Sequence, residues 1–393
     1  KVKLRQGGAG VGGRLNIGVV QRAVLAQACC LLVLAGLLVQ GDLSVPVTAE
    51  RSEVMIRAQE LFQVRTDLLR EGNLDLLDPY YDQNTIGGSW SLEREQARIK
   101  YMGSWLQERN VDLIKAEVMF TRAEEDIGPN EATLSICAHT ILTYRHKDYP
   151  MAWESTMGWR TVHWLELAKK NGQWAVTAEW FVDPLENASQ RPIVAENNAN
   201  LKARGEKLQT WNLMLAEIEP WRKSAANYGD RYAGVKVGFG VGRYNQGYRD
   251  FTGLGGDCAN FVSQALADQD GGNLSQDWGW FYENGEGTVA WLKAEALVQH
   301  LVGSGRASCL ARGTLSQVCA STPAYPSGAI RELLPGDIIA YEEKGEIAHV
   351  SLVVGFDPAG YLLVNSHSAD RYRVPWDLGY NADVVYWLLQ VHG

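Results

Sequence analysis

Apolar and polar residues follow two different periods in the first half of the chain. Residues 54–69 and 91–109 carry apolar residues at helical spacing, and the second stretch opens with a serine N-cap followed by acidic residues, as in a capping box. Residues 115–122, 132–145, 156–169 and 173–181 alternate as strands do, and Asn171-Gly172 is a strong hairpin signal. We therefore predict an α+β domain over residues 50–185.

A polar segment separates this region from the second half. Residues 183–200 contain Pro192 and an asparagine-rich run, and with the helical pattern that follows they predict a linker and helix over 186–220. Beyond it, two glycines end an irregular stretch and apolar residues then recur on one face of a helix. This pattern predicts a helix that begins at Cys258 with Asp257 as its N-cap. A further helix is expected over 288–301, and strands over 337–341, 347–355 and 361–367.

A histidine and other polar residues occupy these strands at regular positions. Period-two alternation places His349, Ser351 and Val353 on one face of their strand. The other face carries Val350, Leu352 and Val354. On the next strand, Asn365 and His367 project to the same side. A cysteine, a histidine and then a polar residue form the layout that a nucleophile, its base and the orienting group require.

Cys258 has two interpretations. At a helix start its thiol lies near the positive end of the helix dipole and near free backbone N–H groups, which lower a thiol pKa and favour a nucleophile. Alternatively, it is a small buried apolar residue, the commonest role of a free cysteine. Asn260 and Gln264 are expected to be structural, and Tyr248 either shapes an oxyanion site or packs a loop.

The cysteine-containing segment carries a family resemblance. Residues 255–264 resemble the signature of the putative amidase domain, a branch of the NlpC/P60 (papain-like) cysteine peptidase superfamily, and residues 334–337 and 348–350 resemble its second half. The resemblance covers residues 221–393 and implies a papain-like α+β fold, with the nucleophile helix packed against an antiparallel sheet. By position it implies Cys258 as nucleophile, His349 as base and His367, or alternatively Asn365, as the third catalytic residue.

The first domain resembles an NTF2-like cone in the order of its elements, helices followed by a curled antiparallel sheet. His139, His146 and His163, with several tryptophans, either line a ligand pocket or belong to the core and rim of the sheet. The domain is then a spacer or a binding module and not a second enzyme.

Composition limits the partners. The 393 residues carry a net charge of −9, which gives no electrostatic footprint for nucleic acid. Six cysteines are too few for a disulfide framework, although Cys309 and Cys319 could close a local loop in an exported protein. No CxxC motif is present, and we expect neither a metal nor an organic cofactor.

The first 49 residues have the pattern of a targeting segment. Five cations lie within residues 1–22, an apolar run follows over 23–39, and a stretch of small residues ends at Ala49. This predicts either a signal peptide or an N-terminal membrane anchor. The protein is expected to be secreted or extracytoplasmic, and to touch a membrane only through this segment if it is not cleaved.

Together these features predict an exported cysteine-dependent amidase or peptidase that acts through a thioester. Its substrate would be a peptide or another amide, with cell-wall peptide (peptidoglycan) as the natural candidate for an exported enzyme. One alternative is a non-catalytic extracytoplasmic binding or scaffold protein. Another is an acyltransferase that resolves the same thioester with an amine or hydroxyl.

Overall fold

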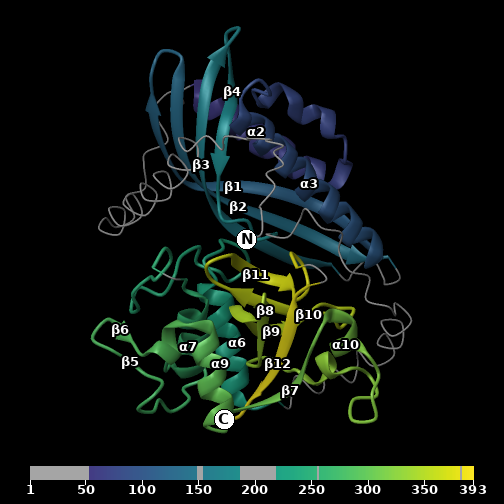
Figure 1. Ribbon diagram of the computed structural model, residues 1–393, viewed down its shortest axis with the longest axis vertical. Helices are drawn as coiled ribbons and strands as arrows, with labels where there is room; N and C mark the ends of the chain where they lie inside the picture. The colour runs from purple at the N-terminus through teal and green to yellow at the C-terminus, as the bar shows by residue number, and fades with distance from the viewer. Residues whose placement is uncertain (1–52, 148–153, 186–217, 255, 381–382) are drawn as a thin grey trace, which may run out of the picture. The chain divides into compact units, whose positions relative to one another are not determined.

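The computed structural model describes residues 53–147, 154–185, 218–254, 256–380 and 383–393. They form a mixed α+β fold built on a large antiparallel sheet (Figure 1). The predicted segment 1–49 and most of the predicted linker 186–220 lie outside the described residues. Within the described part, no helix is both long and apolar enough to cross a bilayer.

The front region, residues 53–185, contains helices followed by four strands, as predicted. The elements are α2 (Glu53–Glu71), the 3-10 helix η2 (Leu74–Tyr80), α3 (Ile86–Glu108), β1 (Val111–Ile127), β2 (Glu131–His146), β3 (Ser155–Lys170) and β4 (Gln173–Trp180). Asn171 and Gly172 have φ values of 51° and 81°, which confirms the tight β3–β4 hairpin. Both long helices bury an apolar face, and their residues share one core with the four strands.

Helix α3 begins earlier than predicted. Thr85, and not a serine near residue 91, caps it by accepting a hydrogen bond from the Gly88 N–H at 3.0 Å. The first turn contains the pair Gly87-Gly88, and close packing requires glycine at these positions. A Cβ on Gly87 would lie 2.4 Å from the carbonyl oxygen of Thr177 in β4. The predicted helix start was therefore wrong because a tertiary contact, and not helix propensity, selects these glycines.

The C-terminal region, residues 218–393, places helices on both faces of its strands (Figure 1). Its helices are α6 (Pro220–Tyr232), α7 (Cys258–Ala267), α8 (Val289–Leu292), α9 (Ala294–Gly303), α10 (Leu315–Cys319) and the 3-10 helix η4 (Ala329–Glu332). Its strands are β5 (Tyr282–Glu283), β6 (Glu286–Gly287), β7 (Ala307–Gly313), β8 (Ile338–Glu343), β9 (Glu346–Phe356), β10 (Leu362–Ser366), β11 (Asp370–Pro375) and β12 (Val385–Val391). The helix predicted over 288–301 is interrupted at Lys293, whose backbone is extended.

The central strands are buried on both faces. In the described residues the sheet order is β1-β2-β3-β11-β10-β9-β8-β12-β7, with β4 also paired to β3. On one face, Val350, Leu352 and Val354 of β9 pack with residues of α6, α7 and α9. On the other face, Val353 and Tyr341 pack with residues of α10 and of the loop before β12. The two sides are called below the α7 face and the α10 face.

Strand β3 joins the front region to the C-terminal region. Arg160, Trp159 and Gly158 of β3 pair with Asp370, Arg371 and Tyr372 of β11. The ladder is supported by a contact of 2.7 Å between the His146 Nε2 and Asp357 Oδ2 atoms and by a buried ion pair between Arg109 and Asp377. We call this junction the β3–β11 seam.

The four cysteines in the described residues are free thiols. Cys309 is an exposed residue of β7 whose thiol lies 3.5 Å from the carbonyl oxygen of Ala311, whereas Cys319 ends α10 and packs on the α10-face core. The local disulfide considered for this pair is not formed here.

Candidate active site

Cys258 is the first residue of α7, as the sequence predicted. Its side chain belongs to the α7-face core and is 6% exposed. Burial raises the pKa of this thiol to about 11, although the backbone N–H groups of Val350, Ala259 and Cys258 itself act in the opposite direction. The expected fall in the thiol pKa is therefore wrong for this arrangement, because desolvation outweighs the helix terminus. The sulfur nevertheless lies among backbone donors that would stabilise a negative charge.

Asp257 occupies the N-cap position but does not cap the helix with its side chain. One carboxylate oxygen accepts the Phe251 N–H at 2.9 Å and the Asn260 side-chain N–H at 2.8 Å. The other oxygen lies 2.6 Å from Nδ1 of His367. The carboxylate thus ties the loop before Cys258 to α7 and to the turn after β10.

His367 is fully buried next to the start of α7. Its ring stacks on Tyr244 with centroids 3.6 Å apart and on Phe261 at 4.1 Å. Its Nε2 atom lies 2.6 Å from the carbonyl oxygen of Tyr232, while Nδ1 faces Asp257. Both ring nitrogens of His367 therefore face acceptor oxygen atoms.

Asn365, the alternative third residue, is bound elsewhere. Its amide donates to Asp230 of α6 at 3.0 Å, and its oxygen accepts the Arg373 N–H at 2.5 Å. Asn365 and His367 both lie on the α7 side, as the alternation predicted, but each has partners other than His349.

His349 lies on the α10 face of the sheet. It pairs across the ladder with Tyr341, and the two rings are 5.7 Å apart. Its Nε2 atom is buried and has no hydrogen-bond partner in the described part of the chain. Val350, the next residue, points to the α7 face and packs in the same core as Cys258.

A β-bulge directly precedes His349. Tyr341 pairs with His349, but Glu342 pairs with Ile347, so Ala348 has no partner in β8. Because strand side chains alternate, a register slip of one residue would turn His349 to the other face.

The structure brings together Cys258, Asp257 and His367, and it does not bring His349 to Cys258. Among the described residues the thiol makes no hydrogen bond to either histidine, while the peptide between His349 and Val350 is close enough for its N–H to reach the sulfur. Sequence reasoning named Asp257 only as a cap and missed its pairing with His367. The acidic residue next to the cysteine was the signal that was available.

The burial of His349 predicts that the protein loses stability in acid. Burial and the nearby Arg371 cation lower the pKa of His349 from 6.5 to about 3. An unfolded histidine binds its proton near pH 6.5, so the free energy of unfolding is fully retained above that pH and falls as the pH drops towards about 3. Thermal melts of wild type and His349→Asn across this range should show a shallower decline for the variant. Parallel curves would contradict this environment for His349.

Tyr248, Asn260 and Gln264 have structural contacts. The Tyr248 hydroxyl donates to Asp268 at 2.8 Å, at the end of α7 opposite Cys258. Asn260 also donates to the Arg249 carbonyl oxygen at 3.0 Å, and Gln264 accepts from Tyr228 at 2.9 Å. These contacts favour loop packing over an oxyanion role for Tyr248.

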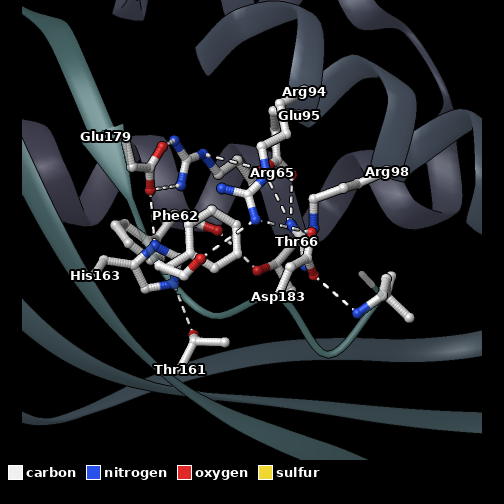
Figure 2. A network of polar contacts seen from close by, with 12 residues as sticks. Phe62, Arg65, Thr66, Arg94, Glu95, Arg98, Thr161, His163, Glu179 and Asp183 are labelled. Carbon is white, nitrogen blue, oxygen red and sulfur yellow. Dashed lines mark hydrogen bonds and ion pairs between the residues drawn. The ribbon is translucent and has the colours of Figure 1, made fainter. Parts of the chain in front are cut away.

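A second polar cluster lies in the front region (Figure 2). The Arg65 guanidinium donates to both Glu179 oxygens, and His163 lies between Glu179 and Thr161 with contacts of 2.7 Å on each ring nitrogen. Arg98 pairs with Glu95 and with Asp183, and completes the network. His139 and His146 have partners across the β3–β11 seam. These contacts favour the core interpretation of the three histidines over the ligand-pocket interpretation.

Comparisons with known proteins agree with the amidase-domain part of the C-terminal resemblance. Residues 220–389 match a family model described as "Putative amidase domain". The chain is also 22% identical over 284 residues to "Uncharacterized protein YhbB" of Bacillus subtilis (strain 168), a match that covers 69% of this chain and 77% of that protein. This match is longer than the amidase-domain segment, so it includes part of the front region. The C-terminal region is therefore similar to a domain whose family description indicates amide hydrolysis.

Solved structures match about a third of the chain with low TM-scores. The intermembrane space region of chloroplast protein ARC6 is 8% identical, covers 34% of this chain and 98% of its own, and gives a TM-score of 0.23. A "Putative calcium/calmodulin dependent protein kinase II association domain" from Xanthomonas campestris is 10% identical with a TM-score of 0.23, and the match covers 36% of this chain and 93% of that one. Scores this low do not assign a fold, so the papain-like and NTF2-like resemblances stay predictions.

Proposed function

We propose that the protein is a cysteine-dependent amidase in which Cys258 is the nucleophile. The observation that carries the proposal is the position of its sulfur, at the start of α7 and among the backbone N–H groups of Val350 and Ala259. Such donors stabilise a thiolate and the oxyanion that forms when the thiolate attacks a carbonyl. The match of residues 220–389 to an amidase-domain family supports amide hydrolysis as the reaction.

The proposed reaction proceeds in two steps. The Cys258 thiol gives its proton to a base, its sulfur forms a bond to the amide carbonyl carbon, and the C–N bond then breaks as the base protonates the departing amine. Water next attacks the thioester carbon, gives its proton to the same base, and releases the carboxylate and the thiol. No electrons are exchanged with an external group.

His349 is the proposed base, and the resemblance to the NlpC/P60 family supports this assignment. The imidazole occupies the α10 face in this arrangement, so catalysis requires a local change of strand β9. The unpaired Ala348 next to it provides the site for such a change, since a slip at a bulge moves the following side chains across the sheet. His367 is proposed to support the site through Asp257, in place of a direct contact with His349.

The proposed substrate is a peptide amide outside the cytoplasm, and cell-wall peptide is the candidate to test first. This step rests on the targeting pattern in residues 1–49 and on the amidase-domain match. The binding-protein alternative has one observation in its favour. A thiol that has a pKa of about 11 and, among the described residues, makes no hydrogen bond to a histidine is a resting group and not an activated one.

A trapping experiment separates the two functions. The full-length protein is incubated with a panel of wall-type peptides and simple peptide amides, amine release is followed, and acid-quenched protein is analysed by mass spectrometry. We expect amine release and an acyl group on Cys258, both absent in Cys258→Ala and both retained in Cys309→Ala, which removes an exposed thiol. Amine release by Cys258→Ala at the wild-type rate would rule out the cysteine mechanism, and peptide binding without any acyl adduct would favour the binding protein.

A further inference from the structure

The β3–β11 seam carries a charged residue of the front region towards the candidate active site. Arg160 of β3 lies directly opposite Asp370 of β11 in the ladder. Neighbouring Gly158 keeps the seam tight, since a Cβ there would lie 2.9 Å from the Thr140 carbonyl oxygen and 3.3 Å from Val235. Arg160 lies outside residues 220–389, the segment that matches the amidase-domain family.

Arg160 and Tyr244 share the carboxylate of Asp370. The Nε atom of Arg160 donates to one Asp370 oxygen at 2.6 Å, and the Tyr244 hydroxyl donates to the other at 2.6 Å. The Asp370 side chain is 5% exposed and that of Arg160 is 22% exposed. A buried carboxylate needs a compensating partner, and Arg160 is the cation that pairs with it.

Tyr244 transmits this contact to the start of α7. Its ring is stacked on His367 with centroids 3.6 Å apart and planes within 11°. His367 in turn contacts Asp257 at 2.6 Å, and Asp257 precedes Cys258. From Asp370 to Asp257 the groups in this series are buried and in close contact. A displacement of Asp370 must therefore displace Tyr244 or break its buried hydrogen bond, and a displaced Tyr244 ring loses its stack on His367.

We propose that Arg160 is a positioning residue for the Cys258 site, and that it acts through Asp370, Tyr244 and His367. The front region is then part of the catalytic unit, in addition to any role as a spacer or binding module. The proposal rests on the function proposed above for Cys258. Arg160 itself touches no reacting atom in this scheme and acts by holding Asp257 and the first turn of α7.

Two measurements test this role in the full-length protein. The first is kcat and KM for the amide identified above. The second is the rate at which iodoacetamide alkylates Cys258 as a function of pH, read by mass spectrometry with the partly buried Cys319 of α10 as internal reference. In Arg160→Ala we expect kcat to fall by about 10- to 100-fold with little change in KM, as a small displacement of reacting groups produces. We also expect Cys258 to be alkylated about tenfold faster because its buried thiol becomes more accessible. The alkylation rate of Cys319 should not change.

Matched variants separate positioning from general destabilisation. Arg160→Lys keeps the charge and should restore part of kcat. Arg145→Ala removes another front-region arginine, whose ion pair with Asp112 at 3.9 Å lies within that region, and should behave as wild type. Tyr244→Phe should resemble Arg160→Ala, and the double variant should be no slower than the slower single variant, since both act through Asp370.

The outcomes distinguish this proposal from the function on which it rests. Three results would each overturn the positioning role. One is a wild-type kcat and a wild-type alkylation rate of Cys258 in Arg160→Ala. The others are an equal loss of kcat in Arg145→Ala, or losses of kcat that multiply in the double variant. If wild type releases no amine, the amidase function fails. The alkylation comparison needs no substrate and still decides whether Arg160 controls the Cys258 site.

Discussion

Amide turnover by His349→Ala is expected to be lower than wild type by about 10²–10⁴-fold, the range that a lost general base produces. The Cys258 thiol, with its pKa of about 11, is protonated at neutral pH and cannot attack until a base removes the proton. His349 is the base carried over from the family resemblance, and its Nε2 atom has no partner in the described residues. Steady-state kinetics of purified, folded variants measure this effect.

Controls make the His349 result specific. His349→Gln keeps a polar side chain at the position and should lose as much activity as the alanine variant. His300→Ala removes a half-buried histidine that contacts Asp277 at 3.1 Å, and should keep wild-type kinetics. A His349→Ala protein with wild-type turnover would move the base to His367, the histidine on the α7 side of the sheet.

Arg222→Ala should lower the free energy of unfolding by about 3–5 kcal/mol, the usual effect of leaving a buried charge without its partner. Arg222 of α6 contacts Asp337 at 2.6 Å, and neither side chain is more than 6% exposed. The guanidinium also donates to the carbonyl oxygens of Pro335 and Val391, so it holds α6 to the start of β8 and the end of β12. Chemical denaturation followed by tryptophan fluorescence measures the change.

The surface pair of Arg249 and Glu286 provides the comparison. The two side chains are 48% and 67% exposed, and their nearest contact is 2.8 Å. Because exposed ion pairs contribute about 0–1 kcal/mol, Arg249→Ala should change stability little. Equal losses in the two arginine variants would contradict the distinction between a buried and an exposed pair at these sites.

The sequence predicted local elements better than their contacts. The start of α7 at Cys258 and the alternation along β9 were both correct, because a glycine-bounded helix start and a period of two are local signals. Alternation does not say which face of a strand meets which helix. Val350 and Leu352 face α6 and α7, while Val353 faces α10, and both sets are apolar. With two buried faces, the side that His349 occupies was not determined by local pattern.

Long-range contacts account for what sequence reasoning missed. Nothing near Arg160 in the sequence indicates its pairing with Asp370, because the two residues meet only through strand pairing across the chain. The same holds for Thr85, whose helix start depends on the approach of β4 to Gly87. The predicted boundary between the regions and the predicted catalytic roles stay predictions.

The β3–β11 seam also has a consequence for the order in which the chain is made. Arg160 and Asp370 are separated by 210 positions. At ribosomal rates of 5–20 residues per second, about 10–40 s pass between their synthesis. During that interval, residues 158–160 of β3 form an open strand edge, the kind of edge that can pair with another nascent chain. A charged arginine and a glycine at this edge make such pairing unfavourable until Asp370 emerges and completes the ladder.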